Sequence, residues 1–422
     1  MSSEIEHSNI ELLSPVGSYE SLHAAIKAGA NAVYFGVEQL NMRSRSAKKF
    51  TLEDLKEIAE TCNEGNVKSY LALNTLVYDH ELPLMRDICD AAKTAGLSAV
   101  IATDISAVSY ARSIGLNVHM STQANISNIE AVEFYAKFAD VVVLARELTL
   151  EQISNIVEEI KKRNIVGPSG ELLKIELFVH GALCVSISGK CYMSLATTNH
   201  SANRGECLQN CRKQYRVIDE STKEELIVDN KFVMSPKDLC TIGFVDQLIN
   251  AGALVFKIEG RGRSSDYVFH TTKAYREAID AHFENSYTQE KVKDWTTRLE
   301  NVFNRGFWHG GYYLGAKLGE WSGAYGSVAK KQKTYIGYVL KYFAKAGVAE
   351  FTIENAGVKV GETIAVTGPT TGYEEREINS LYVDDKPNDS AKKGETMTML
   401  FDARVRRHDK VYVIHDRTAW QS

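Results

Sequence analysis

Hydrophobic and polar positions follow one repeated order from Ile10 to about residue 285: a short apolar run, then a longer amphipathic segment. This order is typical of βα units, in which each strand is followed by a helix. Eight apolar runs predict strands, and they begin at Ile10, Ala32, Lys68, Ala99, Asn117, Val141, Lys174 and Val255. Eight such units fit a (β/α)8 barrel of the TIM type, whose usual length is about 250 residues.

The segments between the runs have the start and stop signals of helices. Those that begin at Ser18, Thr51 and Asn128 start with capping residue types, and several segments end near a glycine. A doubly wound open sheet has the same local alternation, so periodicity alone does not separate the two folds. The barrel is favoured because its strands end on one rim, where active sites lie. Polar residues follow the predicted strands at Asn74, Asp104, Gln123, Arg146, Glu147, His180, Glu259 and Arg261.

The pattern changes after the predicted barrel. Residues 286–333 predict a helix followed by a link rich in glycine and aromatic residues. From Thr334 onward, short alternating runs separated by turn signals predict a small C-terminal antiparallel β-barrel. We therefore expect a TIM-like barrel over residues 1–285, a connector over 286–333 and a β domain over 334–422.

Composition narrows the class of protein. Of 422 residues, 44% are hydrophobic and 24% charged, as in globular proteins, and a net charge of −5 gives no overall attraction to nucleic acid. Any nucleic-acid contact must therefore be local. The N-terminus has no apolar run of a signal peptide, and no window approaches the ~18 apolar residues of a membrane span. We expect a cytoplasmic protein without a membrane partner.

Four of the seven cysteines lie in the loop after the seventh predicted strand, over residues 184–231. In a reducing compartment such a cluster favours metal binding or catalysis over disulfides. We therefore predict a cysteine-bearing insertion over the rim, with metal ligands at Cys184, Cys191, Cys207 and Cys211. The other three cysteines, which we place in helices, are predicted to be small buried apolar side chains: Cys62, Cys89 and Cys240.

The spacing of the four cysteines bears on the metal. Six, fifteen and three residues separate them in turn. Four thiolates suit either a tetrahedral zinc site or a 4Fe-4S cluster. Zinc sites usually pair their cysteines two to four residues apart, and here only Cys207 and Cys211 do so. The wide intervals favour the cluster, with zinc as the alternative.

Basic residues gather at two places. The first place is the barrel rim. An arginine can bind a carboxylate or a phosphate through two hydrogen bonds. The predicted substrate-binding residues at the rim are Arg43, Arg45, Asn74, Gln123, Arg146, Arg261 and Arg263. In the β domain, the segment RVRRHDK suggests RNA contact through Arg404, Arg406, Arg407 and Lys410. A strand end with solvated charges would produce the same segment.

The cysteine segment carries a resemblance to a known family. The residues that match its signature are Glu176, Phe178, Gly181, Ala182, Leu183, Cys184, Gly189, Cys191, Met193 and Ser194. Further matching segments are ELLSPVG, GANAVYFG, STQAN, LARELTLEQI, KIEGRGRSSDYV and NRGFWHGGYYLG. Together they cover most of the chain, which resembles the collagenase-like peptidase family U32.

Within that family, the combination of barrel, four cysteines and small β domain is most similar to the branch that hydroxylates tRNA. The resemblance implies formation of 5-hydroxyuridine at the wobble position, with a 4Fe-4S cluster as cofactor and prephenate as a small anionic co-substrate. It also implies tRNA, the iron-sulfur assembly machinery and a paired family subunit as partners.

Two other functions remain open. The family name implies a peptidase, but the sequence has neither a HExxH helix nor a G-x-S-x-G elbow. A cysteine nucleophile is conceivable because His180 precedes Cys184 by four residues. The third hypothesis, after RNA hydroxylation and peptidase activity, is a non-catalytic binding protein with a structural metal. The candidate catalytic residues are His180, Glu176 and Glu259.

Overall fold

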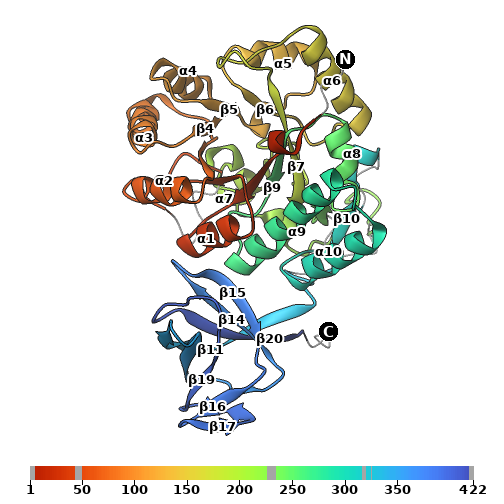
Figure 1. Ribbon diagram of the computed structural model, residues 1–422. Coiled ribbons are helices and arrows are strands. Elements are labelled where there is room, and N and C mark those ends of the chain that lie inside the picture. Colours follow the sequence, from red (N-terminus) through yellow and green to blue (C-terminus); the bar gives the residue numbers. More distant parts are fainter. Residues whose placement is uncertain (1–4, 43–49, 226–233, 316–319, 325, 418–422) are drawn as a thin grey trace.

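A closed parallel barrel forms the larger part of the computed structural model, which describes residues 5–42, 50–225, 234–315, 320–324 and 326–417 (Figure 1). Strand β1 pairs with β2 and β9, and β7 pairs with both β6 and β9, so the sheet closes on itself. The eight strands are β1 (Glu11–Pro15), β2 (Ala32–Phe35), β3 (Lys68–Leu73), β4 (Ala99–Ala102), β5 (Val118–Met120), β6 (Val141–Val143), β7 (Lys174–Gly181) and β9 (Val255–Ile258). The predicted TIM-like barrel is confirmed, strand by strand.

Helices cover the outside of the barrel and bury apolar faces against it. They are α1 (Tyr19–Lys27), α2 (Leu55–Glu64), α3 (Leu82–Thr94), α4 (Ile105–Ser113), α5 (Ile129–Ala136), α6 (Leu150–Lys162) and α9 (Ser265–Phe283). Helix α6 shows why they form where they do. Its N-cap Thr149 and Gln152 exchange hydrogen bonds of 2.9 and 3.3 Å, a capping box that satisfies two free amides. Asp104 caps α4 in a similar way, by accepting from the Ser106 amide at 2.9 Å.

Two short strands extend the barrel wall beyond β7. Strand β8 (Asp238–Cys240) runs antiparallel to the end of β7, and β10 (Phe307–His309) pairs with β8. One prediction is corrected here. Cys240, which we placed in a helix, lies on strand β8, although it is fully buried as expected. The helices near these strands are α7 (Met193–Thr198), α8 (Val245–Asn250) and α10 (Gln289–Asn301).

The C-terminal domain is an antiparallel sheet with its own apolar core. Its strand order is β15-β14-β20-β11-β12-β19-β16-β17, and β13 pairs separately with β18. The strands are β11 (Lys331–Phe343), β12 (Val348–Ile353), β13 (Val358–Lys359), β14 (Thr363–Gly368), β15 (Gly372–Glu377), β16 (Leu381–Val383), β17 (Lys386–Asn388), β18 (Ser390–Ala391), β19 (Thr396–Leu400) and β20 (Lys410–Asp416). The predicted antiparallel architecture is confirmed.

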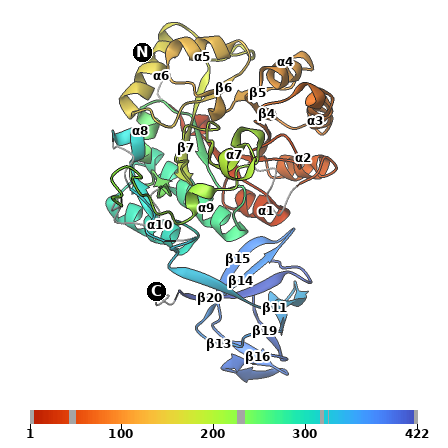
Figure 2. The same cartoon turned by 180° about the vertical axis from the view of Figure 1, so that it is seen from behind.

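The two domains meet where the β14–β15 hairpin lies beside α1, as both views show (Figures 1 and 2). Ala24 of α1 packs with Ala365 and Tyr373 in a small buried cluster. Lys27 donates to the Thr371 carbonyl and to Glu374, both at 2.6 Å. The contact fixes the β domain beside the barrel.

Candidate functional site

A pocket of about 170 Å³ opens at the barrel mouth, where the C-terminal ends of the strands converge. The residue that follows β3, Asn74, lies in it together with Gln123 from the turn after β5. Arg146, Glu259 and Arg261 follow β6 and β9 and line it as well. The structure therefore gathers these five rim residues at one site.

The insertion after β7 forms a second side of this pocket. Cys184, Cys207 and Cys211 all line it, whereas Cys191 stands outside the lining. Figure 2 shows α7, which belongs to the insertion, near the centre of the barrel. The sequence prediction of a cysteine-bearing insertion over the rim agrees with this placement.

Arg212 fastens the insertion to the barrel wall. Its guanidinium donates to Ser235 Oγ at 2.9 Å, to the Pro236 carbonyl at 2.7 Å and to the Leu183 carbonyl at 2.6 Å. These bonds tie the segment around Cys211 to the residue that precedes Cys184. The start of the insertion and the segment around Cys211 are therefore held together, although Cys211 lies 27 positions after Cys184 in the chain.

The four thiols lie close enough to affect one another's ionisation. Burial raises the pKa of Cys184, the nearby Arg146 opposes this, and Cys191 and Cys207 reinforce it. Burial likewise raises the pKa of Cys211 to about 11, against the attraction of Arg212, and the other three cysteines add to the shift. An isolated thiolate is therefore disfavoured here, and a cation or metal would be needed to hold several of them deprotonated.

The four cysteines are the donor type of two metal groups. Four thiolates bind either a 4Fe-4S cluster, one thiolate to each iron, or a single tetrahedral zinc ion. Within the described residues, no three His, Cys, Asp or Glu side chains converge as ligands of one metal ion.

The rim arginines are held in different ways. Arg146 lies 3.9 Å over the Phe178 ring and donates to the Ala182 carbonyl at 3.2 Å, while its buried Nε has no partner among the described residues. Arg261 is buried and donates to Asn41 Oδ1 at 3.2 Å. Arg263 lies 3.5 Å over the Phe303 ring and faces a neighbouring cleft.

Glu176 lies inside the barrel below the mouth and is inaccessible to solvent. Its Oε1 accepts from Lys257 Nζ at 2.7 Å, and its Oε2 stands 3.8 Å from Nδ1 of the buried His119. Burial alone would raise the pKa of Glu176, but Lys257 and His119 outweigh it and hold the pKa below its usual value. Lys257 lines the floor of the mouth, so Glu176 faces the site through this lysine.

His180 does not reach the mouth. Its Nδ1 lies 3.3 Å from the Tyr275 hydroxyl, and its ring packs against Tyr275 and Phe307. Burial, helped by His309, lowers the pKa of His180 to about 3. The imidazole is therefore neutral and packed in the barrel wall rather than turned toward Cys184.

Glu259 is the predicted catalytic candidate that reaches the pocket. The Tyr34 hydroxyl donates to its Oε2 at 3.1 Å and to the Ile258 carbonyl at 2.9 Å. Arg43 and Arg45, the remaining members of the predicted substrate set, lie outside the described residues.

Three basic residues at the mouth were not predicted as site residues from the sequence: Lys257, Arg212 and Arg305. Arg305 is buried, with Nη1 at 3.5 Å from Asp238 Oδ1. Two signals were present in the sequence. A lysine inside the apolar run VFKI is unusual for a strand, and Arg305 belongs to the segment NRGFWHGGYYLG.

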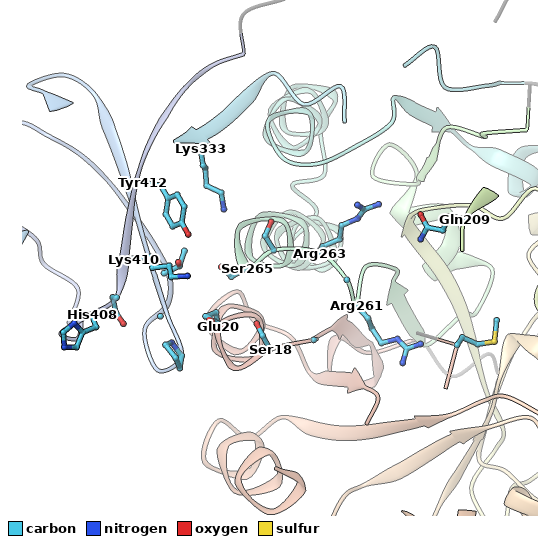
Figure 3. Close-up of a pocket in the computed structure, with 18 of the residues that line it drawn as sticks. Ser18, Glu20, Gln209, Arg261, Arg263, Ser265, Lys333, His408, Lys410 and Tyr412 are labelled. Carbon is cyan, nitrogen blue, oxygen red and sulfur yellow. The ribbon is translucent and has the colours of Figure 1, made fainter. Parts of the chain in front are cut away.

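A larger cleft of about 990 Å³ lies between the barrel and the β domain, next to the mouth (Figure 3). Of the four predicted RNA-binding residues, Arg407 and Lys410 line it, and Arg404 and Arg406 do not. The Arg406 amide instead donates to the buried Asp409 at 2.7 Å, which shapes the turn before β20.

This chain matches one protein family and several known proteins. The model of "Peptidase family U32" matches residues 17–323. A collagenase of Porphyromonas gingivalis is 51% identical over 96% of this chain and 97% of its own length. The tRNA hydroxylation protein P1 of Bacillus subtilis is 30% identical over 89% of this chain and 87% of its own. A 23S rRNA 5-hydroxycytidine synthase of Escherichia coli is 34% identical over 74% of this chain and 46% of its own.

No described helix is long and apolar enough to cross a membrane.

Proposed function

Because this chain belongs to peptidase family U32, whose relatives include RNA hydroxylases by name, we propose that it hydroxylates a pyrimidine base in RNA. The specific reaction we propose is formation of 5-hydroxyuridine at the wobble position of tRNA. A tRNA substrate implies work in the cytoplasm.

One observation carries this proposal: three cysteines of one insertion share a small basic pocket at the barrel mouth. A volume of about 170 Å³ is below the usual range of pockets for larger ligands, so it suits a single ring. To enter such a pocket a base must leave its stack, which costs least in single-stranded RNA. The anticodon loop presents the wobble base in that form.

We assign Cys184, Cys191, Cys207 and Cys211 as the residues that would hold a 4Fe-4S cluster. When bound, such a cluster supplies the redox chemistry that side chains lack. The chain's own contribution is electrostatic. Arg146 opposes the raised pKa of Cys184, and Arg212 does the same for Cys211, so both guanidinium groups favour the thiolate forms that would bind iron.

The other mouth residues suit the remaining parts of the reaction. Arg146, Arg261 and Lys257 offer cations to an anionic co-substrate, which we propose to be the dicarboxylate prephenate. Hydroxylation at C5 replaces a C–H bond by a C–O bond, which is a two-electron oxidation of the ring. Dioxygen or an oxidising co-substrate from solution would have to supply the oxygen atom and take up the two electrons, while C5 releases its proton. Glu259 is the carboxylate at the mouth that we assign to accept it.

The test is the nucleoside content of RNA. Cells that lack the endogenous activity would produce this chain, and the tRNA and rRNA would be digested and analysed by mass spectrometry. We expect a uridine with one added oxygen atom in tRNA from the wild type. Cys184→Ala and Cys211→Ala should abolish it, together with the broad visible absorption of the anaerobically purified protein.

The matched control is Cys89→Ala, because Cys89 is a buried helix cysteine far from the insertion in sequence. It should keep both the modified nucleoside and the absorption. Loss of the nucleoside in Cys89→Ala, or full iron content in Cys211→Ala, would contradict the assignment. A product in rRNA alone would move the substrate from tRNA to rRNA.

A peptidase is the second candidate, favoured by the 51% identical relative named collagenase. Burial raises the pKa of Cys211 to about 11, which disfavours this thiol as a nucleophile because cysteine nucleophiles need a lowered pKa. The pairing with His180 considered for Cys184 is also opposed by the orientation of that ring toward Tyr275. Release of soluble fragments from labelled collagen by the purified protein, lost in Cys184→Ala, would favour this candidate over hydroxylation.

A further inference from the structure

The cleft between the domains has one wall from each of them (Figure 3). Ser18, Glu20, Arg263 and Ser265 come from the barrel side, at the starts of α1 and α9 or just before them. Lys333, Lys410 and Tyr412 come from the β domain on the opposite side, and His408 belongs to the same wall but has its ring turned away from the barrel. The cleft is therefore formed only when both domains are in place.

Its lining is predominantly basic. The permanent cations are Arg261, Arg263, Lys333, Arg407 and Lys410, whereas the carboxylates are Glu20 and Asp409. Lys333 forms an ion pair with Asp266 at 2.6 Å, so part of its charge is already balanced. Arg407 and Lys410 are exposed, and within the described part of the chain neither forms an ion pair. These two cations are the ones most open to an anionic ligand.

The cleft continues into the barrel mouth. Met42, Cys207, Gln209 and Arg261 line both cavities. In Figure 3, Arg261 and Gln209 stand at the end of the cleft away from the β domain. A ligand that follows the cleft thus reaches the cysteine-lined pocket, and its charged part can stay between the domains.

The width of the cleft is set by backbone contact. Gly372 sits at the tip of the β14–β15 hairpin with φ +73°, and a Cβ added there would lie 2.8 Å from the Ala24 amide nitrogen of α1. The buried Ala24, Ala365 and Tyr373 and the salt bridge between Lys27 and Glu374 hold the same contact. The two walls are therefore preformed, which lowers the ordering cost of binding.

We propose that this cleft binds the sugar-phosphate backbone of single-stranded RNA next to the nucleotide whose base enters the mouth. The inference rests on the proposed RNA hydroxylation and adds where the polymer lies. Arg407 and Lys410 contact phosphates from the β-domain wall. Arg261 lies where the base turns away from the RNA backbone and enters the mouth. The ligand is a polyanion with flexible, regularly spaced charges, which matches an elongated basic cleft that ends in a small pocket.

The experiment is a binding titration of the full chain with a fluorescein-labelled, unmodified tRNA anticodon stem-loop, read by anisotropy at several salt concentrations. The test variant is Arg407→Ala with Lys410→Ala. The matched control is Lys345→Ala with Lys386→Ala, which also removes two exposed cations of the β domain, but outside the cleft and outside the predicted RNA-binding set. Full-length protein is used because removing the domain would expose Ala24 and its apolar neighbours.

We expect the test variant to bind about three- to tenfold more weakly and to lower the slope of log affinity against log salt by about 1.4, since each contact to a single strand contributes about 0.7. The control should keep the wild-type affinity within error. Equal losses in both variants, an unchanged slope in the test variant, or binding of an acidic peptide in place of RNA would overturn the cleft assignment.

Failure of this proposal is distinguishable from failure of the proposed function. Nucleoside analysis in cells reports hydroxylation independently of the titration. If the wild type makes the modified nucleoside while the test variant binds RNA normally, the cleft assignment fails and the function stands. If the test variant loses RNA affinity while the wild type makes no modified nucleoside, the cleft assignment stands and the proposed function fails.

Discussion

The barrel interior and the core of the C-terminal sheet are filled by different kinds of side chain. In the barrel, Lys257, Glu176 and His119 are each at most 6% exposed, and they stand among apolar neighbours. The core of the sheet is packed from apolar side chains such as Phe351 and Ile353. TIM barrels usually fill their interior with branched apolar residues, so the barrel is the exception.

Stability alone does not explain the charged side chains of the barrel interior. A buried ion pair costs much to desolvate, and an apolar replacement of similar volume is often equally stable or more so. In addition, Glu176 Oε2 and His119 Nδ1 have no hydrogen-bond partner among the described residues. Lys257 reaches the floor of the mouth, which supplies a functional reason to keep the charges. No residue of the sheet core lines the mouth.

The largest expected effect comes from breaking the buried pair. Lys257→Met leaves the Glu176 carboxylate buried without its cation, which typically costs about 3–5 kcal/mol of unfolding free energy. Urea unfolding followed by the fluorescence of the buried Trp295 and Trp308 measures this loss in the barrel. Lys257→Met with Glu176→Met should regain most of the stability without restoring activity. A single variant as stable as the wild type would show that the ion pair is not needed for folding.

Acid should distinguish the two interiors next. The pKa of His180 falls from an ordinary 6.5 to about 3 in the folded state, mainly through burial, so the unfolded chain takes up a proton that the folded barrel refuses. The stabilisation from neutral His180 is complete above pH 6.5 and is lost as the pH falls toward 3. Between pH 7 and 5 the loss is about 2 kcal/mol. His180→Asn should flatten this part of the stability profile, and an unchanged profile would contradict the assignment to His180.

The smallest effect is expected in the sheet core. Ile353→Val removes one methylene group from a fully buried position and should cost about 0.5–1.5 kcal/mol. Because the change involves no ionisable group, the cost should be the same at pH 7 and pH 5. Thermal unfolding at both values measures it. A cost that changes with pH would mean that the sheet core is coupled to a titrating group.

Much of the fold was predictable because burial leaves a local pattern. Each barrel strand is a short apolar run, and capping residues such as Ser18 and Asn128 mark helix starts. Strand β8 was missed because three residues carry no period, and its pairing with β7 and β10 is decided by residues far away in sequence. Cys240 was assigned to a helix for the same reason.

The site was predictable only in part. Rim position follows from strand order, so Asn74, Gln123, Arg146, Glu259 and Arg261 could be placed at the mouth. The direction in which a side chain points could not be predicted. His180 lies one residue before the end of β7, and therefore close to the rim in sequence, but its ring packs into the barrel wall. The cleft was also hidden, because it combines Arg263 with Lys410 across a domain boundary.

The glycine at the hairpin tip has a consequence for how such chains diversify. Residue 372 adopts a left-handed conformation directly against the backbone of α1, so a side chain there would push the domains apart. A recombination event that exchanged the C-terminal domain alone would succeed only if the incoming hairpin also carried a residue without a Cβ at its tip. Chimeras between relatives should therefore take α1 and the β14–β15 hairpin from the same parent.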